Sequence, residues 1–262
     1  MHGNVQTYGF PPGYFVIRNL ATNRVLDVEK DQIEDGTEVI LWAETETALV
    51  ETRRRPESNN QVFFVDPTGV LCSRSSGHAI DIEGDKLVLR HRRPVSYPFP
   101  NAYAHPLPIF SYSQETGEIS VHFQDDPDYE NEHESDAWKS RSYLLTAIPL
   151  RKPKTILDDA AAFLSSAVST PLSFFSGVSP RPQATPDEVF KGPIDLDENE
   201  VVEEDRGEEA EADDSPETGR KVRMVVIANK CQSDKVLGDK ARNRRRWEVL
   251  SLRRVDARTG GI

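Results

Sequence analysis

Short apolar runs separated by turn residues make up most of the first 150 positions of the chain. The first four runs cover 14–20, 25–28, 37–42 and 60–65. Valine, isoleucine, leucine and phenylalanine fill them, and glycine, asparagine, aspartate and threonine stand between them. Runs of this length and composition, bounded by turn residues, are typical of β-strands, whereas amphipathic helices need longer periodic stretches. The pattern therefore predicts an all-β region.

The same order of runs returns twice further along the chain. A second set covers 69–73, 79–82, 87–91 and 108–112, and a third covers 117–123, 142–148, 222–227 and 246–252. Asp27 and Asp81 stand 54 positions apart, and Phe63 and Phe110 stand 47 apart. A repeat of about 50 residues with four strands suits either a propeller blade or one unit of a β-trefoil. Three units are too few for a propeller, so the sequence predicts an all-β fold, a β-trefoil of three four-stranded repeats.

The third repeat is interrupted by residues 151–220. This segment holds 17 acidic and 7 basic residues, with many prolines and serines. Such a tract cannot bury enough apolar surface to offset its ordering entropy, so we expect a long, mostly disordered acidic insertion. The predicted division is an N-terminal arm, the first part of the trefoil, the insertion, the final strands and a tail: 1–12, 13–150, 151–220, 221–254 and 255–262.

One part of the insertion has a helical pattern. A capping threonine opens the predicted short helix 155–170, and Pro171 would end it. Its apolar residues share one face: Ile156, Ala160, Phe163, Leu164 and Val168. We expect this helix to dock on the trefoil; binding of a partner or of a membrane surface is the alternative. The polar face lacks the basic residues that membrane binding favours.

The first repeat resembles a known family. The segments Val25-Leu26-Asp27-Val28, Ile40-Leu41-Trp42 and Asn60-Gln61-Val62-Phe63 resemble one repeat of the ricin B-type lectins, also called carbohydrate-binding module family 13. Single trefoils of this kind occur among intracellular fungal lectins. The resemblance implies a non-catalytic carbohydrate-binding module.

The closing motif of each repeat varies. The family's Gln-x-Trp motif is Gln61-x-Phe63 in repeat one, and it becomes Pro108-x-Phe110 and Arg245-x-Trp247 in the other repeats. Because all three keep an aromatic residue, we expect these aromatic side chains to lie in the shared core.

The resemblance also places a sugar site in repeat one. Asp27 would accept hydrogen bonds from sugar hydroxyls, Trp42 would stack on the apolar face of the ring, Asn60 would add an amide and Gln61 would support the carboxylate. Ile40 stands where the family has a polar residue. The alternatives are that Asp27 and Asn60 are turn residues and that Trp42 belongs to the core or shields it as a lid.

A second, weaker site is possible in repeat two. Asp81 matches Asp27, and His91 takes the position of the aromatic residue, within the charged run Arg90-His91-Arg92-Arg93. Asp81 also has a turn-capping alternative. In repeat three Asp136 is offset from the expected position, so no binding aspartate is predicted there.

Catalytic and metal chemistry have no candidate. The sequence contains no glycine-rich phosphate loop, no nucleophile elbow and no zinc-protease motif, so we expect neither an enzyme nor a cofactor. His122, His133 and the acids between 125 and 136 lack metal-ligand spacing, which favours a solvated acidic loop over a metal site.

Two other functions remain open. One is a protein-interaction module or protease inhibitor that acts through the long loops 43–60 and 92–107. The other is a degenerate scaffold that presents the acidic insertion to a protein partner. A glycan or glycoconjugate remains the favoured partner.

The remaining partners follow from charge and from the termini. The N-terminus has no basic start followed by an apolar run, and no stretch of about 18 apolar residues occurs. With only Cys72 and Cys231, no disulfide framework is expected, so we predict a cytoplasmic protein without a membrane partner. The basic stretch 240–246 is compatible with nuclear entry or nucleic-acid binding. A loop that complements the acidic insertion is favoured, because the rest of this chain, of net charge −12, would repel a polyanion.

Overall fold

The computed structural model describes residues 6–96, 100–101, 103–127, 136–151, 212–213, 221–227 and 239–254. The predicted helix 155–170 and nearly all of the insertion lie outside these ranges. None of the helices among the described residues is long and apolar enough to cross a membrane.

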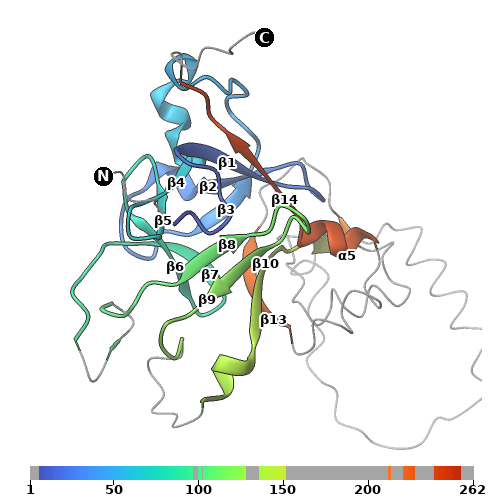
Figure 1. Ribbon diagram of the computed structural model, residues 1–262. Coiled ribbons are helices and arrows are strands. Elements are labelled where there is room, and N and C mark those ends of the chain that lie inside the picture. The colour runs from blue at the N-terminus through green and yellow to red at the C-terminus, as the bar shows by residue number, and fades with distance from the viewer. Residues whose placement is uncertain are drawn as a thin grey trace, which may run out of the picture.

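Each of the three repeats contributes four strands (Figure 1). Repeat one has β1 (Tyr14–Asn19), β2 (Val25–Val28), β3 (Val39–Trp42) and β4 (Phe63–Val65). Repeat two has β5 (Leu71–Ser73), β6 (Ala79–Glu83), β7 (Lys86–Arg90) and β8 (Ile109–Tyr112). Repeat three has β9 (Ile119–His122), β10 (Ser142–Ala147), β13 (Val222–Ile227) and β14 (Trp247–Ser251). The β-trefoil predicted from the sequence is confirmed.

The smaller elements lie in the connections. Short 3-10 helices occupy η1 (Glu29–Asp31), η2 (Glu51–Arg53), η3 (Pro56–Gln61) and η4 (Asp136–Ser140). The helix α5 (Asp239–Arg244) precedes the last strand, and β11 (Leu150–Arg151) pairs with β12 (Ala212–Asp213).

Repeat three is assembled from two distant parts of the chain. β13 pairs antiparallel with β10 over six residues, from Ser142 opposite Ile227 to Ala147 opposite Val222. β14 pairs with β1, so the last strand lies beside the first. β1 also pairs with β4 of its own repeat. Two strands that are far apart in the sequence, β10 and β13, are therefore neighbours in the sheet.

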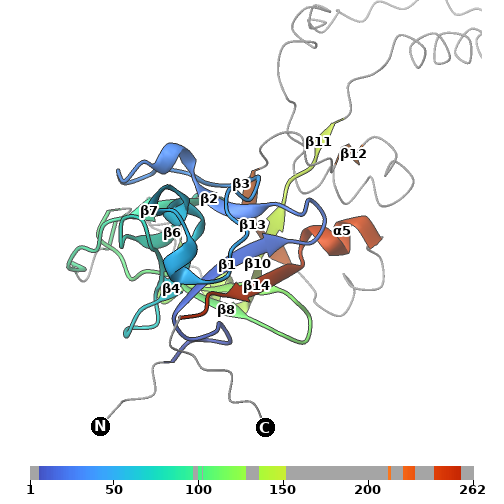
Figure 2. The same cartoon turned by 90° about the horizontal axis from the view of Figure 1, so that it is seen from above.

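The strand pairs β2–β3, β6–β7 and β10–β13, one from each repeat, lie close together in the fold (Figure 2). Leu89 N–H donates to the Thr37 carbonyl over 2.8 Å, and Met224 N–H donates to the Asp85 carbonyl over 2.7 Å. The hairpins of repeats one and three are thus both tied to the hairpin of repeat two.

The aromatic residues of the closing motifs lie in the core, as the sequence predicts. Phe63, Phe110 and Trp247 are each no more than 1% exposed. Trp247 places its indole N–H 3.2 Å from the Leu145 carbonyl, which satisfies the one polar group that its burial brings into the core.

The core extends into the predicted N-terminal arm. Phe10 is buried and stacks on Phe15 with ring centroids 5.2 Å apart. Gly9 has φ +86°, and a Cβ atom built there would lie 1.9 Å from the Tyr112 carbonyl oxygen. Only glycine fits this close backbone approach, so residues 9 and 10 belong to the trefoil.

The basic stretch before β14 is largely built into the fold. Arg244 and Arg245 are 1% and 7% exposed, so their charged groups are not displayed on the surface. Asn19 Nδ2 donates to the Arg244 carbonyl over 2.8 Å, which ties α5 to the end of β1. Burial of two of its arginines weakens the nucleic-acid interpretation of this stretch.

Candidate functional site

The register of β2 and β3 places Asp27 and Trp42 on one face of their hairpin. Asp27 pairs with Ile40, and Val25 pairs with Trp42. Since paired residues share a face and alternate residues return to it, Asp27, Ile40 and Trp42 lie on the face opposite to Leu26. Leu26 belongs to the main core, so the site face is the outer one.

Two amides hold the Asp27 carboxylate. Gln61 Nε2 donates to Oδ2 over 2.7 Å, and Asn60 Nδ2 donates to Oδ1 over 3.1 Å. Gln61 is itself fixed, because Nε2 also donates to the Ala43 carbonyl and Oε1 accepts from both N–H and O–H of Thr45. The carboxylate is therefore oriented by neutral groups. A carboxylate oxygen accepts two hydrogen bonds, so one amide on each leaves capacity for a ligand.

Burial changes the protonation of this carboxylate. Asp27 is 4% exposed, and this desolvation raises the pKa of Asp27 to about 6. The bond from Gln61 opposes the rise in pKa, the charge of Asp31 adds to it and the bond from Asn60 opposes it. Asp27 is thus an anion at neutral pH and takes up a proton in mildly acidic solution.

Trp42 is exposed. Its side chain is 46% exposed, which rules out the core alternative for this residue. The guanidinium carbon of Arg24 lies 5.9 Å from the ring centroid, within range of a cation–π contact. Such a ring on the site face can stack against the apolar side of a flat or cyclic ligand.

A hollow lies next to Thr45, the residue that holds Gln61. It has a volume of about 340 Å³ and is lined by Thr45, Arg55, Glu57 and Ser58. Asp27 and Trp42 are not among its lining residues, but Thr45 is the residue that bonds to Gln61. Asn60 is both a residue of η3 and a donor to Asp27, so its turn role and its site role coexist.

Asp81 of repeat two occupies the register position of Asp27 but has charged partners. It pairs with Val88 as Asp27 pairs with Ile40. Arg90 Nε donates to Oδ2 over 2.9 Å, and His105 Nε2 lies 3.0 Å from the same oxygen. Asp81 is only 1% exposed, and its carboxylate is already bound by these two side chains.

Asp81 and His91 are not brought together, contrary to the second site predicted from the sequence. Ala79 pairs with Arg90 as Val25 pairs with Trp42, so Arg90 is the counterpart of the tryptophan. His91 is one residue beyond this position, and because side chains alternate along a strand, it is not the counterpart of the tryptophan. His91 binds Asp35 instead, with Nδ1 2.7 Å from Oδ1.

Two further observations concern His91 and repeat three. The His91 ring lies against the ring of His78, with centroids 3.7 Å apart and the two planes tilted by 44°. In repeat three, Thr146 pairs with Arg223 at the positions of Asp27 and Ile40. The counterpart of Asp27 in repeat three is therefore a threonine.

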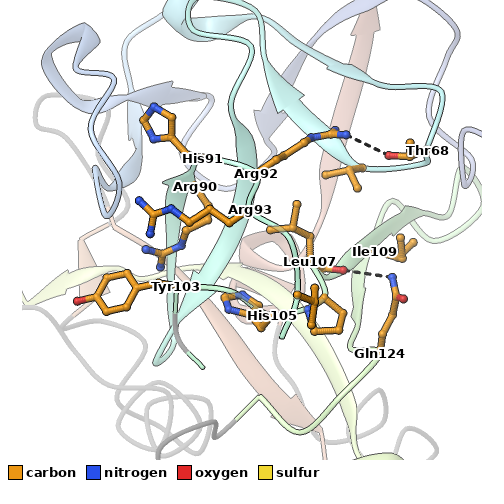
Figure 3. Close-up of a pocket in the computed structure, with 13 residues that line it drawn as sticks. Thr68, Arg90, His91, Arg92, Arg93, Tyr103, His105, Leu107, Ile109 and Gln124 are labelled. Atoms are coloured by element: carbon orange, nitrogen blue, oxygen red, sulfur yellow. Dashed lines mark hydrogen bonds between the residues drawn. The ribbon is translucent and has the colours of Figure 1, made fainter. Parts of the chain in front are cut away.

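A cavity lies beside Asp81 that the sequence did not reveal. Its volume is about 260 Å³, and Arg90, Tyr103, His105 and Gln124 are among its lining residues (Figure 3). His105 and Tyr103 come from the loop between β7 and β8, for which the sequence has no periodic signal. The sequence feature that could have indicated this contact is Pro108. Proline has no side-chain amide, so it cannot donate to Asp81 as Gln61 donates to Asp27, and another residue must do so.

The described residues form no cluster of metal-ligating side chains. Within the ranges given above, no three His, Cys, Asp or Glu side chains gather as metal ligands do. His122 Nε2 lies 2.9 Å from Ser111 Oγ, and His133 falls outside the described residues.

Comparison with known proteins found likenesses in structure alone. No protein-family model matches the chain, and no curated protein matches its sequence. Among solved structures, the C-half of the earthworm R-type lectin in complex with GalNAc is 20% identical, with a TM-score of 0.31, over 52% of this chain and 78% of that one. The chain is similar to ricin B-type lectins.

Two further solved structures resemble the chain. The Macrolepiota procera ricin B-like lectin in complex with lactose is 14% identical, with a TM-score of 0.29, over 55% of this chain and 78% of that one. The solution structure of the mdaA-1 domain is 15% identical, with a TM-score of 0.43, over 95% of this chain and 96% of that one. These likenesses concern the fold.

Proposed function

We propose that the chain is a non-catalytic carbohydrate-binding protein that binds a sugar through repeat one. Asp27 accepts hydrogen bonds from two neighbouring hydroxyls, Trp42 stacks on the C–H side of the ring and Asn60 adds an amide. Gln61 holds the carboxylate in place without touching the sugar. The observation that supports this most is that Asp27, whose carboxylate is held by amides, and the exposed Trp42 lie on the same face of one hairpin.

The apolar Ile40 shapes the expected affinity. It lies between Asp27 and Trp42 on the outer face, as the register of β2 and β3 shows, and it offers no hydrogen bond. A site with one charged acceptor and one stacking ring recognises a pair of hydroxyls and an apolar patch of a saccharide. We expect a weak site for a terminal monosaccharide, which gains strength on multivalent glycans.

Titration calorimetry and a glycan array test this proposal. The earthworm and Macrolepiota lectins were solved with GalNAc and lactose, so these two sugars are the first probes. Binding should be lost in Trp42→Ala and retained in Trp138→Ala, which removes a tryptophan in η4 of repeat three. Silence of the unaltered chain across neutral glycans, or equal binding by both variants, would contradict the proposal.

Loop 43–60 supports a second function, that of a protein-interaction module or protease inhibitor. Arg54 is a buried residue of this loop, and its Nη1 donates to the carbonyl groups of Glu46 and Ala48 in the same loop over 2.6 and 2.9 Å. An inhibitory loop must be held in one conformation before it binds, and these bonds do so. Inhibition of a panel of serine and cysteine proteases at micromolar concentration tests this function.

A further inference from the structure

The cavity of repeat two differs in chemistry from the site of repeat one. Its polar and aromatic lining residues include three arginines, two histidines and a tyrosine: Arg90, Arg92, Arg93, His91, His105 and Tyr103. None of the described residues that line it is an aspartate or a glutamate. A hollow with cations in its wall and no carboxylate favours negatively charged ligands.

Two replacements and one occupied carboxylate explain why this cavity is unsuited to the role of repeat one. Arg90 stands at the register position of Trp42, which removes the stacking ring. Pro108 stands at the position of Gln61 in the closing motif, which removes the amide support. The carboxylate of Asp81 is taken by Arg90 and His105, so it cannot accept from hydroxyls as Asp27 can.

Two of these arginines, the buried Arg90 and the partly exposed Arg93, lie beside an exposed aromatic ring. The guanidinium carbons of Arg90 and Arg93 lie 5.9 and 5.8 Å from the centroid of Tyr103, as Figure 3 illustrates. Tyr103 is 62% exposed, and the Arg93 side chain is 45% exposed. Arg93 Nη2 donates to Asp35 Oδ2 over 2.6 Å, a contact that uses one of the five N–H groups of a guanidinium.

Carboxylates hold these cations from outside the cavity. Arg90 pairs with Asp81 and Glu83, Arg93 pairs with Asp35, and Arg92 pairs with Asp66. These four acids balance the charge of the three arginines, but none of them is a lining residue, so a ligand in the cavity would meet guanidinium groups and no carboxylate. The arginines are thereby fixed in position before a ligand arrives, which lowers the entropic cost of binding.

We propose that this cavity binds a small ligand that carries an oxyanion, a carboxylate or sulfate group, with Arg93 as the principal contact and Tyr103 beside it. The volume of about 260 Å³ suits a single ring or a free ion. A free oxyanion and an acidic monosaccharide share this chemistry. The site is separate from that of repeat one, so the proposal does not depend on binding of neutral sugars there.

Titration calorimetry of the full chain, in low-salt buffer without other oxyanions, tests the proposal. The probes are glucuronate, glucose as its neutral counterpart, and inorganic sulfate, with sodium chloride to match ionic strength. We expect glucuronate to bind with 1:1 stoichiometry while glucose does not. Sulfate that binds as tightly as glucuronate identifies a free-oxyanion site, and weaker sulfate binding identifies an acidic-saccharide site; both support the proposal.

Variants then assign the binding to the cavity. Arg93→Gln should weaken glucuronate binding about tenfold or more, because it removes a charge-assisted contact. Arg93→Lys should retain part of the affinity. The matched control is Arg242→Gln in α5, since that arginine is 41% exposed and likewise pairs with one aspartate.

Several results would overturn the proposal. Equal binding of glucuronate and glucose is the first. The second is a heat of binding that sodium chloride at the same ionic strength also produces, and the third is unchanged glucuronate affinity in Arg93→Gln. Trp42→Ala should leave glucuronate binding intact. A chain that fails to bind GalNAc but binds glucuronate would therefore separate the two proposals.

Discussion

Gln61 Nε2 and Asp27 Oδ2 are joined by a hydrogen bond of 2.7 Å across 34 positions of the sequence. Gln61 is fully buried, and its remaining bonds go to Ala43 and Thr45 in the loop after β3. This one amide therefore connects the closing motif of repeat one to its hairpin and to the following loop. Stability and ligand binding should both depend on it.

Gln61→Ala should destabilise the protein and abolish sugar binding. The substitution leaves Asp27 Oδ2 and the Thr45 N–H without the partner that Gln61 provides, which costs about 1–3 kcal/mol for an unsatisfied buried group. Urea unfolding measures the loss. Gln124→Ala is the control, because Gln124 is exposed and makes one longer bond to Leu107; equal losses in both variants would contradict this role of Gln61.

Sugar binding by repeat one should weaken as pH falls. Burial raises the pKa of Asp27 to about 6, so the carboxylate is ionised at pH 7.5 and largely protonated at about pH 5. A protonated carboxyl group loses part of its capacity to accept from hydroxyls. Calorimetry with GalNAc across this range should show affinity falling with a midpoint near pH 6; a flat profile would count against Asp27 as the acceptor.

The same carboxylate should affect stability in the opposite sense. Its folded-state pKa lies above the unfolded value of about 3.9, so its ionisation in the folded state costs free energy at neutral pH. This cost disappears as pH falls from about 6 towards about 4. The free energy of unfolding of the unaltered chain, measured relative to Asp27→Asn, should therefore rise over this window.

Gly9→Ala should destabilise the fold more than Gly77→Ala. Both glycines have positive φ, +86° and +73°, but an added Cβ atom would meet the Tyr112 carbonyl at 1.9 Å at Gly9 and nothing within 4 Å at Gly77. The backbone penalty of about 1–2 kcal/mol is common to both variants, so their difference isolates the steric clash. Thermal unfolding of the two variants gives this difference, and equal midpoints would contradict the docking of residues 9 and 10.

The repeats made the strands predictable, because an alternation of apolar runs and turn residues survives in all three units. Phe63 and Trp247 could be assigned to the core for the same reason. The position of His91 could not be resolved, since a one-residue choice between Arg90 and His91 depends on the pairing with Ala79 and not on composition. His105 escaped prediction because its contact with Asp81 depends on the path of an irregular loop. The Asp27–Gln61 pair was recoverable only through family resemblance.

Asp81→Asn should cost much more stability than Asp27→Asn. Asp81 is buried against Arg90 and His105, so its neutralisation removes the buried counter-charge of Arg90, which keeps only the exposed Glu83, a loss of about 3–5 kcal/mol. Asp27 has only neutral donors, and Asn60 carries a buried Oδ1 without a hydrogen-bond partner. Rotation of the Asn60 amide would present this oxygen to the new side-chain amide at position 27. Urea unfolding at pH 7 should rank the two variants in this order, and the reverse order would show that the two aspartates do not differ in the way that their partners imply.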